Sequence, residues 1–144
     1  MLYMLDTNIC SYIIRNKPPH IREKLETIEQ HHTVALSSIV VTELTYGATK
    51  KGSPKLTRLI DAFIGNFTLY DYDRSAAQPY AELRAHLEQT GKIIGAHDLL
   101  IAAHTLSLNA ILVTNNLREF ERIDGLVLED WSQPNKGDIE SRPE

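Results

Sequence analysis

Three acidic residues stand in otherwise apolar surroundings, and their type and spacing define the chemistry open to this chain. Asp6 follows an apolar run, Glu43 lies inside a second one, and Asp98 directly precedes a third. A buried carboxylate needs a hydrogen-bonding partner or a metal ion. Two carboxylates about 4 Å apart repel each other by roughly 4 kcal/mol at an effective dielectric constant of 20. Three ionised acids would therefore converge only around a cation, and oxygen ligands of this kind are those that Mg²⁺ or Mn²⁺ prefers.

Each of these acids has a simpler explanation when it is considered alone. Asp6 and Asp98 each begin a helical pattern, where an aspartate caps the first turn, and Glu43 would be ordinary at the solvent edge of a helix. Their joint occurrence favours a metal site. Glu119 is a weaker candidate because the residues around it, from 118 to 122, are mostly charged, as is typical of a solvated surface.

Two histidines share the segment that Asp98 begins. His97 precedes the acid and His104 follows it by less than two helical turns. Zinc sites usually need closer spacing and more histidine or cysteine ligands, so we expect both side chains to serve packing.

The elements that must position these residues alternate along the chain. Apolar runs of strand length are expected at residues 2–5, 33–36, 67–70, 110–114 and 126–128. Segments of helical periodicity are expected at residues 9–14, 19–30, 38–48, 56–64, 75–89 and 98–108. This alternation predicts an α/β fold with a parallel central sheet flanked by helices on both faces. Since ligands bind at the carboxyl ends of parallel strands, the carboxylate of Asp6 should face a crevice.

Length and composition limit the alternatives. The 144 residues suffice for one domain, expected from 1 to 131, and the polar remainder, 132–144, is expected to be a disordered tail. No apolar run approaches the ~20 residues that cross a membrane, and the single cysteine, Cys10, cannot form an internal disulfide, which fits the cytoplasm. The net charge of −4 argues against a protein that holds nucleic acid simply by being basic. A nuclease with acids in its active site stays open.

Four ordered blocks of the sequence resemble the PIN-domain ribonucleases of the VapC toxin type. The blocks are residues 4–8 (Met-Leu-Asp-Thr-Asn), 38–47, 95–103 (which includes Ala-His-Asp-Leu-Leu-Ile-Ala-Ala) and 112–120. Asp-Thr-Asn alone would be weak evidence, but four blocks at suitable spacing are specific. The resemblance extends from Met1 to about Trp131 and implies a PIN-like fold.

Carried over residue by residue, the resemblance makes Asp6 and Asp98 the primary metal ligands and Glu43 the third acid. Thr7 and Asn8 would orient Asp6.

The last block departs from the family pattern. Thr114 would line the pocket, but many PIN domains carry an aspartate where this chain has Asn116. A second metal site would then be weak, bridged by water, or completed by Glu119.

The function that the resemblance implies is cleavage of structured RNA by a type II toxin. A bound Mg²⁺ (or Mn²⁺) would support phosphodiester hydrolysis that leaves a 3′-hydroxyl and a 5′-phosphate, with tRNA as the expected substrate and the anticodon loop of initiator tRNA as a candidate. A VapB-type antitoxin and a homodimer are the expected assemblies. The alternative is a catalytically inactive PIN-fold binding module or antitoxin decoy. An aspartate-based phosphatase is disfavoured because that chemistry wants an acid where Asn8 stands.

Overall fold

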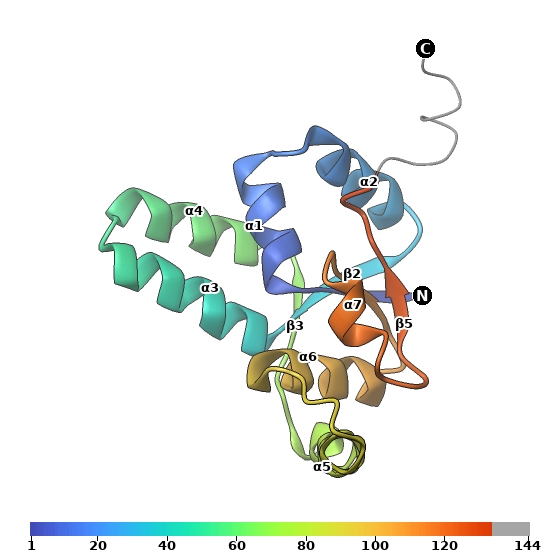
Figure 1. Ribbon diagram of the computed structural model, residues 1–144. Coiled ribbons are helices and arrows are strands. Elements are labelled where there is room, and N and C mark those ends of the chain that lie inside the picture. Colours follow the sequence, from blue (N-terminus) through green and yellow to red (C-terminus); the bar gives the residue numbers. More distant parts are fainter. Residues whose placement is uncertain (134–144) are drawn as a thin grey trace, which may run out of the picture.

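A five-stranded sheet forms the centre of the computed structural model, which describes residues 1–133 (Figure 1). The strands are β1 (Leu2–Leu5), β2 (Thr33–Ser37), β3 (Thr68–Tyr70), β4 (Ile111–Val113) and β5 (Val127–Glu129). Their order in the sheet is β3-β2-β1-β4-β5, and every neighbouring pair is parallel. The central strands are continuous apolar runs because helices cover both of their faces. The predicted parallel sheet is therefore confirmed.

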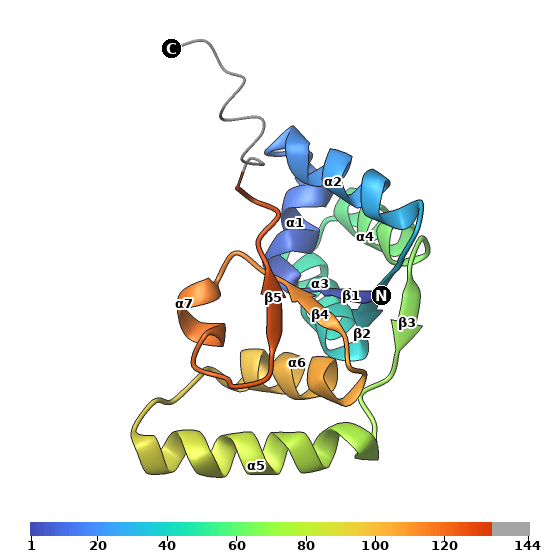
Figure 2. The same cartoon turned by 90° about the vertical axis from the view of Figure 1, so that its right-hand side faces the viewer.

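Helices lie on both faces of this sheet, as predicted. They are α1 (Thr7–Arg15), α2 (Pro19–Glu29), α3 (Ser38–Lys51), α4 (Pro54–Ile64), α5 (Arg74–Thr90), α6 (Ala96–Ser107) and α7 (Leu117–Phe120). Figure 2 shows α1 and α2 on one face and α5 and α6 on the other. None of the helices within residues 1–133 is long and apolar enough to span a membrane.

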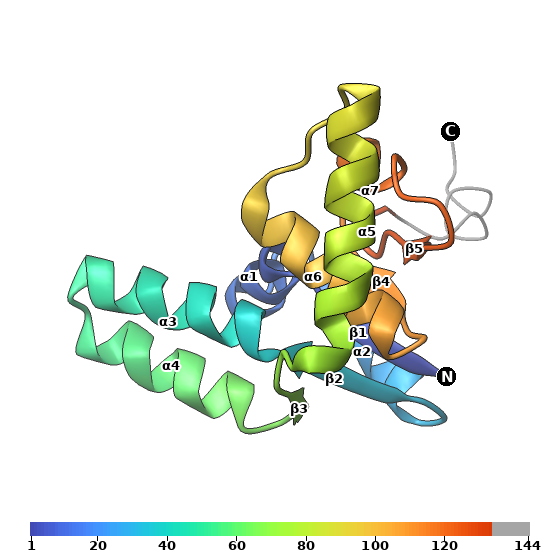
Figure 3. The ribbon, with the colours of Figure 1, turned by 90° about the horizontal axis from the view of Figure 1, so that it is seen from below.

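Helices α3 and α4 form an antiparallel pair that extends away from the sheet (Figure 3). The sequence predicts a loop from Lys50 to Pro54, whereas the structure continues α3 through Lys51 and begins α4 at Pro54. Two lysines complete the last turn of α3, where cations interact favourably with the helix dipole. Gly52 then takes a positive φ of 63° as the C-cap, and the Ser53 hydroxyl accepts a hydrogen bond from the Leu56 amide to cap α4.

Two features near the C-terminal end complete the fold. The chain leaves β4 through the short helix α7, where the sequence predicts an irregular turn. Trp131 is buried and its ring lies 5.9 Å from that of Tyr3. The predicted disordered tail begins at Ser132 and lies, apart from residues 132 and 133, outside the described residues.

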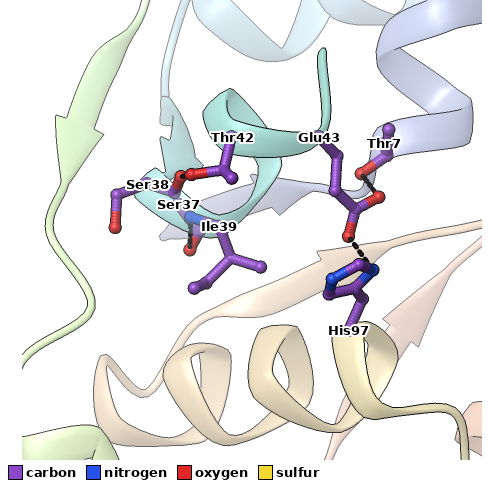
Figure 4. A network of polar contacts seen from close by, with 7 residues as sticks. All are labelled: Thr7, Ser37, Ser38, Ile39, Thr42, Glu43 and His97. Atoms are coloured by element: carbon purple, nitrogen blue, oxygen red, sulfur yellow. Dashed lines mark hydrogen bonds and ion pairs between the residues drawn. The ribbon is translucent and has the colours of Figure 1, made fainter. Parts of the chain in front are cut away.

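A buried histidine connects α6 to the beginning of α3. The Nδ1 atom of His104 lies 2.7 Å from the hydroxyl oxygen of Ser37, and both side chains are 1% exposed. The same hydroxyl oxygen accepts a hydrogen bond from the Ile39 amide and so caps α3 (Figure 4). Burial lowers the pKa of His104, which favours the neutral ring, and Nδ1 of that ring shares a hydrogen bond with the Ser37 hydroxyl group. His104 serves packing, as the sequence predicts.

Replacing Ser37 by alanine is expected to lower the free energy of unfolding by about 2 kcal/mol, since the change removes a helix cap and leaves a buried imidazole nitrogen without its partner. Urea denaturation followed by circular dichroism measures this loss. The matched control is Ser53→Ala, which removes a cap without a buried histidine, and for which about 1 kcal/mol is expected. Equal losses in the two variants would contradict an energetic role for the His104 contact.

Candidate active site

The predicted acids gather where the order of the strands reverses. Strands β1 and β4 are neighbours in the sheet although one begins the chain and the other lies far along it. The chain runs on from β1 toward β2 on one side and from β4 toward β5 on the other. Such a switch point opens a crevice at the carboxyl ends of the strands. Asp6 and Thr114 are the residues that follow β1 and β4, so their side chains meet at this place.

Asp6 is held by two hydrogen bonds although it is only 4% exposed. Its Oδ1 atom accepts from the Ile9 amide at 2.9 Å, which caps α1, and its Oδ2 atom accepts from the Thr114 hydroxyl. Burial raises the pKa of Asp6 to about 6, and the charges of Glu43 and Asp130 act in the same direction, against the two hydrogen bonds. The fold therefore keeps a carboxylate where its negative charge is costly.

Glu43 projects from α3 toward Thr7 and His97 (Figure 4). Its charge acts on both Asp6 and Asp98. Its Oε2 atom accepts a hydrogen bond from the Thr7 hydroxyl at 2.8 Å. Its Oε1 atom is buried and has no hydrogen-bond partner within residues 1–133, and the imidazole Nδ1 atom of His97 lies 3.4 Å away. A buried carboxylate oxygen without a donor is costly, and a bound cation would remove that cost.

Asp98 lies in the first turn of α6 and is half-buried. The pKa of Asp98 is raised to about 7, and burial is the main cause. A side-chain hydrogen bond with Glu119 and the negative charge of Glu119 are the next two causes. The charges of Asp6 and Glu43 raise the pKa of Asp98 further. The carboxylates are thus close enough to oppose one another's ionisation.

Glu119 holds the loop before α6 rather than projecting into solvent. Its Oε1 atom accepts from the Gly95 amide and its Oε2 atom accepts from the Asn116 side-chain amide, each at 2.8 Å. The bond from Gly95 is the main cause that lowers the pKa of Glu119. At pH values below about 7, a charged Glu119 therefore faces a protonated Asp98.

The donor set fits a divalent cation in its chemistry. Mg²⁺ or Mn²⁺ would complement hard carboxylate oxygens, the raised pKa values of Asp6 and Asp98, and one buried Glu43 oxygen without a donor. In the described part of the chain, however, no three histidine, cysteine, aspartate or glutamate side chains lie close enough together to hold one ion. At least one side chain would have to move when an ion binds. The assignment of Asp6, Glu43 and Asp98 as ligands therefore stays a prediction.

The supporting residues differ in role from what the resemblance implies. Thr7 holds Glu43, not Asp6, and Thr114 holds Asp6. Asn8 is exposed and makes no side-chain hydrogen bond within residues 1–133. The Asn116 side-chain amide donates a hydrogen bond to Glu119, and the Asn116 backbone amide donates one to the Thr114 hydroxyl oxygen. Sequence spacing cannot reveal these pairs because they depend on which loops meet.

Sequence reasoning missed two residues near the centre. His97 is assigned to packing above, yet its side chain is 71% exposed and faces Glu43. Asp130 contributes negative charge that raises the pKa of Asp6. The available signal for Asp130 was its position directly after the last strand, at the same sheet edge as Asp6.

Removing the Thr114 hydroxyl is expected to weaken cation binding at this centre about 10-fold, because partners that orient a carboxylate ligand typically have effects of 10- to 100-fold. In Thr114→Val the Asp6 carboxylate loses a hydrogen bond that lowers its pKa. Calorimetric titration with Mn²⁺ measures the affinity. The matched control is Thr105→Val, which changes another fully buried threonine that bonds only within α6. Equal Mn²⁺ affinity in both variants would show that Thr114 does not support cation binding at this centre.

A groove leads away from the centre along α3. Its volume is about 360 Å³, and residues of α1, α3 and α4 line it. Thr7 and Glu43 belong both to the groove and to the candidate centre. The lining continues along α3 to Lys51, a rise of about 12 Å for eight helical residues. A bound chain lying in this groove would therefore pass directly by the acids.

Comparison with known proteins agrees with this arrangement. The model of the PIN domain family matches residues 3–126. Ribonuclease VapC2 of Rickettsia felis is 46% identical over 134 residues, which cover 92% of this chain and 100% of that protein. The tRNA(fMet)-specific endonuclease VapC of Salmonella typhimurium is 43% identical over 130 residues, covering 90% of this chain and 97% of that protein.

A solved structure shares the fold as well. The crystal structure of VapBC2 from Rickettsia felis bound to a DNA fragment from its promoter matches with a TM-score of 0.86 and 45% identity, covering 91% of this chain and 99% of that one. A sheet with acids at its switch point and a match over nearly the whole chain define a PIN domain. The chain belongs to the VapC ribonucleases of the PIN-domain family.

Proposed function

We propose that this chain is the toxin of a type II toxin–antitoxin pair and a divalent-metal-dependent endoribonuclease. Its expected substrate is tRNA, with the anticodon loop of initiator tRNA as the first candidate, and its expected place of action is the cytoplasm. The observation that carries the proposal is the set of mutually repelling carboxyls at the switch point, beside a buried Glu43 oxygen that lacks a donor. The relative of Salmonella typhimurium, named for cleavage of tRNA(fMet), supports the choice of substrate.

In this proposal the side chains of the centre have separate tasks. Asp6, Glu43 and Asp98 would hold Mg²⁺ or Mn²⁺, and the ion, when bound, supplies positive charge that activates water and offsets charge on the phosphate. Thr114 and Thr7 keep Asp6 and Glu43 in fixed orientations through their hydroxyl groups. The reaction is hydrolysis of one phosphodiester bond, which leaves a 3′-hydroxyl and a 5′-phosphate.

The carboxyl groups of Glu119 and Asp98 would hold the loop before α6 in place and bind a proton when no cation is present. Glu119, bonded to the Gly95 amide, keeps the start of α6 in place. Its negative charge beside Asp98 favours a proton on Asp98 when no cation is present. A cation would displace that proton, so metal binding in this protein should release protons near neutral pH.

The expected protein partner is a VapB-type antitoxin that lies in the groove along α3. Apolar side chains of the groove, among them Ile14, Leu44 and Ile60, suit the apolar face of a helix. A chain in this groove would pass the acids, where one of its basic side chains could replace the cation's charge. The structure of VapBC2 from Rickettsia felis, which contains both proteins of such a pair, supports this expectation. The homodimer expected from the family is tested by the mass of the free protein in solution.

The deciding experiment is incubation of purified protein with total tRNA in the presence of Mg²⁺ or Mn²⁺. Cutting of a discrete tRNA species, abolished by EDTA, is the expected result, and sequencing of the product ends would give the cleavage position. A folded, antitoxin-free protein that cuts no tRNA with either ion would contradict the tRNA assignment. Failure on other structured RNAs as well would favour the inactive binding module.

A further inference from the structure

We infer that the tip of the α3–α4 hairpin binds the phosphate backbone of the RNA substrate beside the bond that is cut. The name hairpin tip is used here for four exposed cations, Lys50, Lys51, Lys55 and Arg58. This inference rests on the proposed function and adds to it the surface that would hold the substrate.

The hairpin tip concentrates positive charge in a chain that is otherwise acidic. Residues 44–60 contain four cations and no aspartate or glutamate, while the whole chain carries a net charge of −4. Neither of the two ion pairs within residues 1–133 includes a residue of the hairpin tip. The four charges are therefore available to a polyanion, and they lie on the end of α3 and the beginning of α4, which the short turn at Gly52 and Ser53 joins.

The groove connects this charge to the candidate active site. Lys51 lines the groove together with Glu43, and Arg15 of α1 adds a further cation to its wall. The rise of about 12 Å along α3 between the acid and the lysine corresponds to a few nucleotides of an extended strand. A strand whose scissile phosphate lies at the acids would therefore place neighbouring phosphates at the hairpin tip. Helices α3 and α4 project beyond the sheet, and the hairpin tip lies at the far end of this projection (Figure 3).

An RNA backbone fits the hairpin tip better than a protein helix does. The apolar lining of the groove lies between α1 and the inner sides of α3 and α4, whereas the cations stand on exposed positions at the far end. A protein with net negative charge repels RNA at long range, so a nuclease of this composition needs a local surface that offsets the repulsion. The hairpin tip carries the densest group of cations along the sequence.

The test compares two triple variants of equal charge change. Lys51→Gln, Lys55→Gln and Arg58→Gln remove three of the four positive charges of the hairpin tip. Lys17→Gln, Lys24→Gln and Arg74→Gln remove three positive charges outside the hairpin. Each triple variant is made in the wild-type background for cleavage assays. Each is also combined with Asp98→Asn, so that RNA binding can be measured without cleavage. Binding of a fluorescein-labelled tRNA anticodon stem-loop is followed by anisotropy between 50 and 300 mM KCl. Thermal melts check that each variant is folded.

The hairpin triple is expected to bind at least about 10-fold more weakly at 100 mM KCl and to lower the slope of log K against log salt by about 2, since each lost phosphate contact removes about 0.7 from the slope. The control triple should change both quantities far less. RNA binding that is equal in the two triples would overturn the inference and assign the hairpin tip to a protein partner. Absence of any RNA binding would overturn it as well.

These results are separable from the proposed function. If wild type cuts no RNA while the hairpin triple still weakens RNA binding, the nuclease proposal fails, and of the inference only the binding of an RNA backbone by the hairpin tip stands. If wild type cuts tRNA, and the hairpin triple cuts it at the same rate and with the same salt dependence as the control triple, the inference fails and the proposed function stands.

Discussion

Replacement of Asp98 by asparagine is expected to lower the rate of RNA cleavage about 10³-fold, the size of effect seen when one group that stabilises transition-state charge is removed. The same change should raise the melting temperature of the metal-free protein at pH 8. At that pH Asp98 is ionised although burial and neighbouring carboxylates raise its pKa to about 7. A neutral amide of the same shape relieves this repulsion but cannot replace the charge that holds a cation.

Opposite changes in activity and stability separate a role in the active site from ordinary damage. The assay combines tRNA cleavage at saturating Mg²⁺ with thermal denaturation in EDTA. The matched control is Asp61→Asn on the exposed surface of α4, for which neither quantity should change measurably. A variant at position 98 that keeps more than a tenth of the wild-type rate would exclude Asp98 as a principal ligand. A variant that loses activity together with stability would point to misfolding.

The metal-free protein is expected to become less stable as pH rises from about 4 to 6. Asp6 titrates near 3.8 when unfolded and near 6 when folded. Between these values the folded state binds more protons than the unfolded state, so each rise in pH favours unfolding. The full shift corresponds to about 3 kcal/mol, present below pH 4 and lost by pH 6. Asp98, whose pKa is also raised, extends the same trend toward pH 7.

A cation should reverse this loss only where the carboxyls are ionised. Mn²⁺ at 1 mM is therefore expected to raise the melting temperature at pH 8 and to have little effect at pH 5. Urea denaturation at a series of pH values, with EDTA or Mn²⁺, gives both results. In Asp6→Asn, which can keep the cap of α1, the decline between pH 4 and 6 should largely vanish. An equally steep decline in that variant would show that other groups cause it.

Local sequence patterns were enough to predict most of the fold. The apolar runs that end at Leu5 and Val113 become the two central strands because only helices on both faces can cover such runs. Asp6 was considered as a helix cap, and it caps α1. The helix expected at residues 38–48 continues through Lys51 as α3, which packs against α4.

The partners of the acids could not be predicted in the same way. Thr7 and Glu43 are 36 residues apart in the chain, and their hydrogen bond depends on how α3 packs against α1. The sequence assigns His97 to packing, and only the approach of α6 to α3 brings its side chain to Glu43. The choice of the three acids came from their apolar contexts and from the family resemblance. The distances between them follow from tertiary packing, which no local pattern encodes.

The hydrogen bond from Thr114 to Asp6 joins residues that are 108 positions apart, and this separation matters while the chain is being made. Synthesis on the ribosome delivers Asp6 first, and Thr114 follows 108 residues later. A nascent chain therefore cannot complete the centre until Thr114 has left the exit tunnel. Until that point, a chain still attached to its ribosome carries Asp6 without the hydroxyl group that orients it.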